Sequence, residues 1–240
     1  MKIVYISGYS AWWGQYHPAV LDRDTGGTVG GGEAGMLMSA FGLARGGHVV
    51  TVYCCALPCV YRDVTFRPER DFYKDLRDAP DAVVAWSDPE PLHAVPPPAS
   101  RLLVQQLNDL SMFPGWDRAV DRLVSPSNDH ARFMRSLGWT GPQAVMHNGC
   151  DPSLYADALP PRERPMRVGY WSSPDRGLHH VLRVWPHVRR RVPSAELYVA
   201  YEMDRLFGVV QDASYSDEHM VRIRAVRDAA LGARLAVDLD

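Results

Sequence analysis

Short apolar runs rich in Val, Ile and Tyr recur along the first part of the chain. They occupy residues 2 to 7, 49 to 54, 81 to 86, 101 to 107, 122 to 127 and 143 to 147. The runs show little alternation between apolar and polar positions, which is typical of strands buried on both faces of a parallel sheet. The pattern therefore predicts a parallel sheet with both faces covered.

Helical patterns separate several of these runs. One face of the first helix is apolar, formed by Met36, Leu37, Ala40, Phe41 and Ala44, and a Gly-Gly pair at 46 and 47 supplies its stop signal. A second helix is expected over residues 128 to 137, with three inward positions: Phe133, Met134 and Leu137. Strands that alternate with helices predict a doubly wound α/β domain, whose ligands bind at the carboxyl ends of the strands.

A proline-rich, charged stretch at residues 158 to 165 divides the chain, which predicts a linker or hinge. The block after it has the order strand, helix, strand, helix, strand, at residues 166 to 173, 177 to 192, 195 to 201, 217 to 231 and 233 to 240. This order makes about half of a doubly wound domain. We therefore expect a first domain over residues 1 to 157 and a partial second domain over residues 166 to 240.

Composition narrows the class of protein. Hydrophobic residues make up 46% of the chain and charged residues 22%, which is ordinary for a folded globular protein. The net charge of -2 provides no positive field for nucleic acid. The N-terminal apolar run is too short for a signal peptide or a membrane span. We expect a cytoplasmic protein, with peripheral attachment to the inner membrane left open.

The cysteines favour buried thiols over a metal site. Three of the four lie in "CCALPC", as Cys54, Cys55 and Cys59. The adjacent pair breaks the usual spacing of zinc ligands, and no second half-site accompanies it. We expect no bound metal and no cofactor.

A glycine cluster, "GGTVGGGEAG" at residues 26 to 35, lies at the entrance of the first predicted helix. A dinucleotide fingerprint would follow the first strand directly, but that strand ends near Ser7, which disfavours an NAD site. Exposed backbone N–H groups and the helix dipole suit an anionic group such as a pyrophosphate. Glu33 falls in the first turn, and a loop without a ligand is the alternative.

Four blocks of the sequence resemble the retaining GT-B glycosyltransferases of the family 4 type, also called glycosyl transferase group 1. They are "GGGEAGMLMSAFGLARGGHVVTVY", "VDRLVSPSNDHARFM", "MHNGCDPSLY" and "VGYWSSPDRGLHHVLRVWPHVRRRVPSAELYVAY". Together they cover most of residues 1 to 201 in the family's order. The resemblance implies two doubly wound, Rossmann-like domains. The acceptor would bind on the N-terminal side and the nucleotide-sugar donor on the C-terminal side, without a catalytic metal.

The resemblance also implies roles for particular residues. The backbone amides of Gly31 and Gly32 would approach the donor phosphates. Arg176 matches the family's lysine, which neutralises the diphosphate leaving group, where fixed cations act most strongly in the transition state. Trp171 occupies the place of the family's arginine, so one expected cation is missing.

Further positions are expected on the acceptor side or in the cleft. Glu33 and Asn148 are expected to line the acceptor side or the cleft. Asn148 belongs to the family's Asn-Gly-x-Asp block. Asn108 and Asp109 stand where members often carry His-Asp and are the candidate catalytic residues. Asparagine hydrogen-bonds a hydroxyl but does not titrate as histidine does. A plain turn residue is the alternative for Asn108.

The sequence supports three readings of function. The leading one is transfer of a sugar, as in hexosyltransferases, from a nucleotide sugar to a hydroxyl acceptor with retention of configuration. The family's late Glu-x7-Glu motif is missing, which points to a C-terminally truncated chain and favours a non-catalytic sugar- or nucleotide-binding relative. A GT-B sugar-nucleotide epimerase is the third. Ser127 and His130 show no triad partner, which disfavours a hydrolase. The apolar end, residues 233 to 240, predicts self-association.

Overall fold

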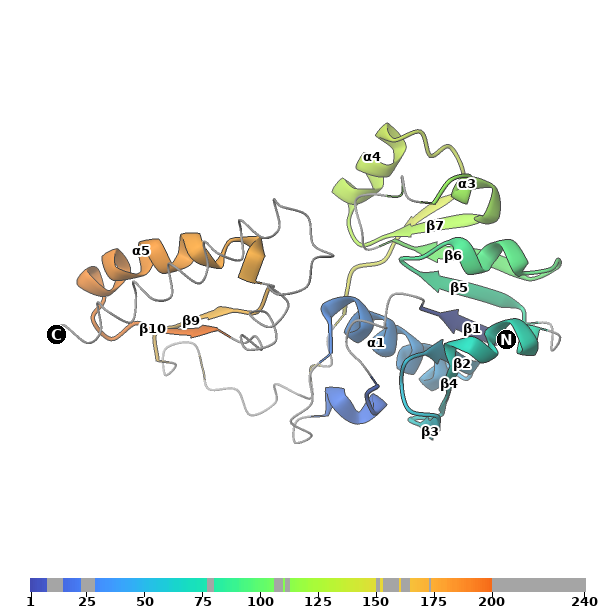
Figure 1. Ribbon diagram of the computed structural model, residues 1–240, viewed down its shortest axis with the longest axis horizontal. Coiled ribbons are helices and arrows are strands. Elements are labelled where there is room, and N and C mark those ends of the chain that lie inside the picture. The colour runs from blue at the N-terminus through green and yellow to red at the C-terminus, as the bar shows by residue number, and fades with distance from the viewer. Residues whose placement is uncertain are drawn as a thin grey trace, which may run out of the picture. The chain divides into compact units, whose positions relative to one another are not determined.

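The computed structural model describes residues 1–7, 15–22, 29–76, 80–105, 110, 113–149, 152, 160, 165–172 and 174–199 (Figure 1). The chain divides into two compact units, Met1–Asp157 and Ala158–Asp240, and each is described by itself. The helix expected at 217 to 231, the final strand and its self-association lie outside the described residues.

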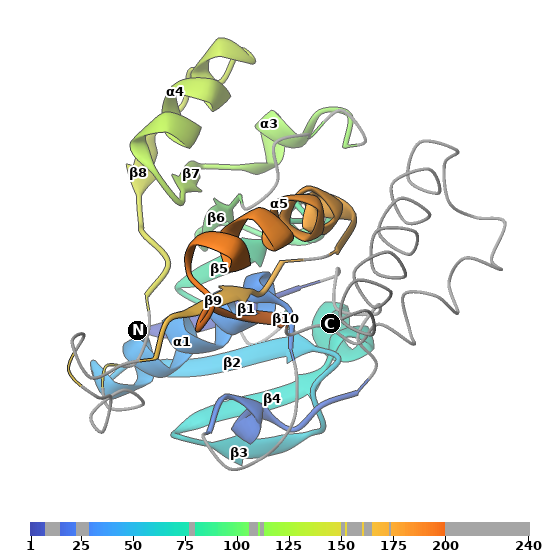
Figure 2. The ribbon, with the colours of Figure 1, turned by 90° about the vertical axis from the view of Figure 1, so that its left-hand side faces the viewer.

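The first unit is built on one large sheet. Its eight strands have the order β3-β4-β2-β1-β5-β6-β7-β8, and every pair is parallel except β3 with β4. The strands are β1 (Lys2–Ile6), β2 (Val49–Cys54), β3 (Cys59–Tyr61), β4 (Val64–Pro68), β5 (Ala82–Trp86), β6 (Ser100–Val104), β7 (Arg122–Ser125) and β8 (Gln143–Val145). The chain adds β2 and β4 on one side of β1 and β5 to β8 on the other, so the strand order reverses between β1 and β5 (Figure 2).

Helix α1 (Gly31–Arg45) covers one face of the sheet. Its predicted apolar face is confirmed, because Met36, Leu37, Ala40, Phe41 and Ala44 are all buried in one cluster with β1, β2 and β4. The other helical segments are shorter. They are η2 (Pro18–Leu21), η3 (Glu69–Asp71), α2 (Phe72–Asp75), η5 (Glu90–Ala94), α3 (Trp116–Ala119) and α4 (Asn128–Ser136).

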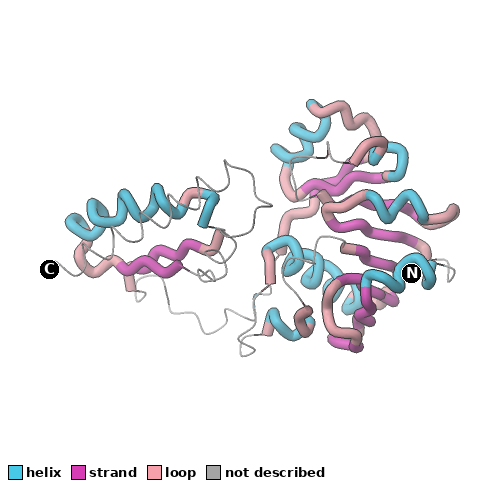
Figure 3. The backbone as a smooth tube through the Cα atoms, in the orientation of Figure 1, coloured by secondary structure: helices cyan, strands magenta, loops and turns pink. Residues whose placement is uncertain are grey.

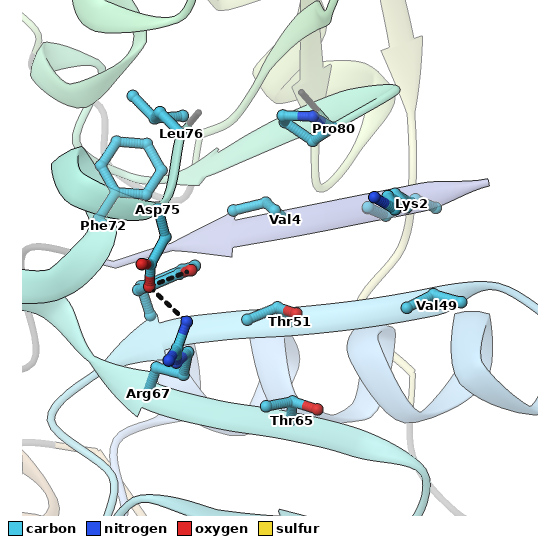
Figure 4. A pocket seen from close by; sticks show the side chains of 12 residues that line it. Lys2, Val4, Val49, Thr51, Thr65, Arg67, Phe72, Asp75, Leu76 and Pro80 are labelled. Carbon is cyan, nitrogen blue, oxygen red and sulfur yellow. Dashed lines mark hydrogen bonds and ion pairs between the residues drawn. The ribbon is translucent and has the colours of Figure 1, made fainter. Parts of the chain in front are cut away.

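The prediction that both faces of every strand are buried is correct for β5, whose five residues are all buried, but wrong for β1 and β2. On the face opposite α1, residues of β1, β2 and β4 line an open pocket of about 290 Å³ (Figure 4). Val49 is 65% exposed there. In its described residues, the connection from β4 to β5 carries η3 and the four-residue α2, which are too short to cover three strands.

The hairpin of β3 and β4 was not predicted from the sequence. Its two-residue turn consists of Arg62 and Asp63, both in the left-handed region with φ of 48° and 60°. Such turns usually contain Asn or Gly, so the sequence gives no signal for one here. Arg62 Nη2 donates to Asp22 Oδ1 at 2.6 Å, which ties the hairpin to the segment before the glycine cluster.

Helix α4 forms as predicted, but its expected inward face is only partly correct. Met134 is completely buried, whereas Phe133 and Leu137 are exposed. The helix covers only the last strands of the sheet, so burial of a narrow strip of its surface is enough to hold it in place.

The described residues of the second unit form a two-stranded parallel sheet and one long helix. Strands β9 (Arg167–Tyr170) and β10 (Glu196–Val199) pair in register, and α5 (Leu178–Arg191) runs alongside them (Figure 3). A short turn, η8 (Pro174–Arg176), precedes the helix. Leu178 is buried, and the other apolar positions on one side of α5 are half-buried: Val181, Leu182, Trp185 and Val188. Among the described residues, no helix is long and apolar enough to cross a membrane.

Candidate functional site

The buried polar side chains of the described part gather at one edge of the large sheet. Besides Glu33 in the first turn of α1, they are Ser7, Ser87, Gln105 and Ser125, which end or directly follow β1, β5, β6 and β7. Because these strands are parallel, the four side chains lie at their common carboxyl edge. Doubly wound sheets bind ligands at this edge. The candidate site is therefore the carboxyl edge around the reversal between β1 and β5.

The backbone at the end of β5 is unusual. Ser87 has a φ of 68°, in the left-handed region that few residues other than glycine adopt. A hydrogen bond from its N–H to the oxygen of Val104, at 2.9 Å, holds this conformation. Strained backbone of this kind concentrates at functional sites, because the surrounding structure must compensate for it.

The amino end of α1 lies at this edge and contains the predicted Gly31 and Gly32. Gly30 is the N-cap and provides no side chain to bind the first N–H groups of the helix. A Cβ atom on Gly31 would meet nothing within 4 Å, and one on Gly32 would meet only Trp86 Nε1 at 3.8 Å. Neither glycine has a positive φ. Protein packing and backbone conformation therefore do not require glycine at these two positions.

Trp86, the last residue of β5, packs beneath this helix end. It is 3% exposed, and within the described residues its indole Nε1 has no hydrogen-bond partner. Its ring also lies 3.1 Å from the position of a Cβ on Gly35, so glycine is required there for close packing. An N–H donor without an acceptor costs free energy, which an oxygen atom of a ligand beside Gly32 would recover.

Glu33 is 8% exposed, and burial raises the pKa of its carboxyl group.

Cys54 is held by two hydrogen bonds to its sulfur. The Tyr16 hydroxyl donates to Cys54 Sγ at 3.7 Å, and the Ala56 N–H donates to the same sulfur at 3.4 Å. Burial raises the pKa of the Cys54 thiol to about 11, so it stays protonated at neutral pH. Cys54 is thus part of the core, and in the described part no three metal-binding side chains lie together.

Asn148, which follows β8, lies beside α1 near this helix end. Its Oδ1 lies 3.6 Å from the position of a Cβ on Gly35. The residues before it follow the carboxyl edge, since the Met146 N–H donates to the oxygen of Ser125 at 2.9 Å. His147 Nδ1 lies 3.1 Å from the oxygen of Pro126. The structure therefore brings Asn148 together with the turn that contains Gly31, Gly32 and Glu33.

The remaining predicted residues fall outside the described part or belong to the second unit. Asn108 and Asp109 fall outside the described residues. Arg176 is exposed at the end of η8 in the second unit. It directly precedes Gly177, the N-cap residue of α5, which has a φ of 118°. Trp171 is 75% exposed after β9, and its ring lies against Gly169, where a Cβ would overlap it.

Comparison with solved structures identifies the fold as the GT-B type. Residues covering 98% of this chain match 68% of sucrose-phosphate synthase from Thermosynechococcus elongatus, with a TM-score of 0.52 and 11% sequence identity. A match to OtsA in its apo form covers 97% of this chain and 70% of that protein, with a TM-score of 0.50 and 12% identity. No model of a protein family and no curated protein matches the sequence. At such identities the likeness is one of fold.

Several site residues were not singled out from the sequence. Trp86, Ser87 and Gln105 end or follow apolar runs, where they look like ordinary strand residues. His130 was considered only as a member of a triad, and its contact with Ser125, whose Oγ lies 3.1 Å from His130 Nδ1, was not predicted. One signal was available: in parallel strands the last residues of every run share one edge, so polar residues at these ends are candidates for a site.

Proposed function

We propose that the protein is a glycosyltransferase that moves a sugar from a nucleotide-sugar donor to a hydroxyl acceptor with retention of configuration. One observation carries the proposal: in a GT-B fold, the indole N–H of Trp86, which has no hydrogen-bond partner within the described part of the chain, lies under a glycine-rich helix end at the reversal of the strand order. Such a helix end offers N–H groups and a positive dipole to an anionic oxygen.

In this proposal the donor diphosphate lies against Gly31 and Gly32. Their missing side chains allow phosphate oxygens to approach the helix N–H groups. Arg176 contributes a guanidinium that forms bidentate hydrogen bonds with phosphate. No catalytic metal takes part. Charge that develops on the leaving diphosphate is stabilised by these fixed donors.

The acceptor side is proposed to include Glu33 and Asn148. Both lie beside the same helix turn, and their oxygens accept hydrogen bonds from sugar hydroxyls. Asn108 and Asp109 remain the proposed catalytic positions, next to the acceptor hydroxyl. Because asparagine does not titrate, the leaving phosphate would take the acceptor proton.

The first test is substitution of the glycine turn. Gly32→Val should lower the affinity for nucleoside diphosphates at least tenfold, because the side chain fills the space of the phosphate. Its thermal unfolding should change little, since a Cβ at this position meets only ordinary contact. Calorimetry with UDP, ADP and GDP measures the affinity.

Gly42→Ala is the matched control. Gly42 lies in the same helix, and a Cβ there also meets nothing within 4 Å. This variant should bind diphosphates as the wild type does. Equal binding by Gly32→Val and wild type would mean that the helix end does not hold the phosphates. With UDP-glucose, ADP-glucose and GDP-mannose as donors, the anomeric configuration of the product tests retention.

A second candidate is binding of a nucleotide sugar without turnover. Trp171 favours it, because an exposed indole stands where the resemblance implies a cation that would neutralise the leaving group. The same measurements separate the two functions. Diphosphate binding without release of any sugar product from the three donors would identify the non-catalytic protein.

A further inference from the structure

One edge of the Trp86 indole lies along the first turns of α1. A Cβ atom on Gly35 would lie 3.1 Å from Trp86 Cζ2, and one on Gly32 would lie 3.8 Å from Trp86 Nε1. Both ring atoms belong to the same edge of the indole, whose hydrogens point outward in the plane of the ring. The Nε1–H bond is therefore directed toward the turn that contains Gly32.

The indole nitrogen is a buried donor that cannot accept a hydrogen bond. Trp86 is 3% exposed, and within the described part of the chain its Nε1 has no hydrogen-bond partner. The close contact with Gly35 and the ring of Tyr5, whose centroid lies 6.4 Å from that of Trp86, hold the indole in this orientation. Since buried donors are almost always paired, an acceptor is expected on the side of Gly32.

The amino end of α1 adds two more donors on the same side. The first hydrogen bond of the helix joins the Ala34 N–H to the oxygen of Gly30 at 2.9 Å, so the N–H groups of Gly31 and Gly32 precede it. Gly30 is the N-cap and has no side chain that could accept from them. The carboxyl group of Glu33 accepts a hydrogen bond from its own N–H, so it does not compete for the other two.

A ligand group at this point meets several donors and must accept from them without donating. The oxygens of an ionised phosphoryl group carry no hydrogen and bind strongly to N–H groups, whereas the hydrogen of a sugar hydroxyl would need an acceptor of its own. An oxygen about 2.9 Å from Nε1 would occupy the space into which a side chain at position 32 extends. Glycine at this position, which neither packing nor φ requires, is thus explained by the approach of such an oxygen.

We infer that Trp86 is a phosphate-binding residue, whose Nε1–H donates to a phosphoryl oxygen that lies against Gly32. The inference rests on the proposed function for the expected ligand, the diphosphate of a nucleotide sugar. It extends the phosphate site from the backbone of α1 to the carboxyl end of β5. The same chemistry would bind the phosphate of a sugar phosphate, and the test separates these two sources.

The first arm of the test reads the indole N–H in the wild-type protein. Each of the seven tryptophans gives one ¹H–¹⁵N indole signal. Trp86 is recognised by nuclear Overhauser contacts with the Hα hydrogens of Gly32 and by the loss of its signal in Trp86→Phe. Titration with inorganic pyrophosphate, UDP, ADP, GDP or glucose 6-phosphate should shift this hydrogen downfield, because a charge-assisted hydrogen bond forms. The indole signal of Trp139 should not shift.

The second arm removes the donor. Phenylalanine keeps an aromatic ring but lacks the N–H, so Trp86→Phe should lower the affinity for any probe that binds by about tenfold or more. Calorimetry measures the affinity, and thermal unfolding shows whether the variant is folded. If Trp86→Phe does not fold, the first arm decides.

Trp139→Phe is the matched control. Trp139 is 6% exposed, and its Nε1 also lacks a partner among the residues that the structure describes. It belongs to a different core cluster from Trp86. This variant should therefore bind the probes as the wild type does.

The outcomes separate this inference from the proposed function. A probe that binds without shifting the Trp86 signal, or that binds equally well to wild type and folded Trp86→Phe, would overturn the inference. Binding of none of the probes would overturn both. A shift with glucose 6-phosphate alone, or a shift with a nucleoside diphosphate but no transfer from any of the three nucleotide sugars, would contradict only the proposed function.

Discussion

At the scale of single residues, the candidate site contains residues that lower the stability of the fold. Gly31 and Gly32 stand in a helix turn where alanine would fit, and Trp86 keeps an indole N–H without an acceptor among the described residues. Glu33 adds a buried carboxyl group. Residues that lower stability without a packing reason are expected where function requires them.

Glu33 gives a direct test of this conflict. Because burial raises its pKa above the ordinary 4.5, the folded protein favours the protonated carboxyl. The resulting stabilisation is complete below the unfolded-state pKa and is lost as the pH rises through the raised pKa. At pH 7, Glu33→Gln should therefore unfold at higher urea concentration, with a gain of roughly 1 kcal/mol, the lower end of the cost of burying an uncompensated polar group.

The comparison should be made at two pH values. Near pH 4 the gain of Glu33→Gln should shrink, because the wild-type carboxyl is then largely protonated. Glu90→Gln, which changes an exposed carboxyl group, should leave stability unchanged at both. A gain that is equal at pH 4 and pH 7 would show that the charge of Glu33 is not its cause.

At the scale of elements, hydrophobic periodicity predicted most of the first unit. The apolar runs gave β1, β2 and β5 to β8, and the 3.6-residue pattern gave α1 with its correct inner face. The β3–β4 hairpin was missed because Arg62 and Asp63 adopt turn conformations that their residue types do not indicate. The open face of β1 and β2 was missed because coverage depends on the length of α2, not on the strands themselves.

The contact of α1 with β5 can be tested through Gly35. A Cβ on Gly35 would lie 3.1 Å from Trp86 Cζ2, and the buried ring has little room to move. Gly35→Ala should therefore destabilise the protein by about 1 to 3 kcal/mol, the usual cost of overpacking a core. Gly42→Ala in the same helix should instead gain up to about 1 kcal/mol from helix propensity. Chemical denaturation measures both. A gain in stability for both Gly35→Ala and Gly42→Ala would show that α1 does not pack this closely on Trp86.

At the scale of the whole molecule, only a part of the candidate site could be predicted from the sequence. Gly31, Gly32 and Glu33 stand out in the sequence because a glycine cluster at a helix entrance has few structural explanations. The remaining edge depends on which strands lie side by side, and that order is set by pairing between distant segments. The polar ends of β5, β6 and β7 could be assigned to a common edge from the sequence, but their neighbours at that edge became known only from the assembled sheet.

The assignment of donor phosphates to both units makes one quantitative prediction. Arg176→Ala should weaken binding of a nucleoside diphosphate by about 1 to 3 kcal/mol, the usual loss for a charge-assisted hydrogen bond. If Gly32 and Arg176 serve the same diphosphate, the double variant Gly32→Val with Arg176→Ala should lose less than the sum of the two single losses, by more than the roughly 0.5 kcal/mol within which independent sites add. Arg183→Ala, an exposed arginine farther along α5, should change neither the affinity nor the coupling. Titration calorimetry of the four proteins of this cycle with the tightest-binding diphosphate measures the coupling. Strict additivity would show that the two residues contribute independently, which contradicts a shared grip on one diphosphate, because a diphosphate that is displaced from one of its anchors cannot engage the other with full strength.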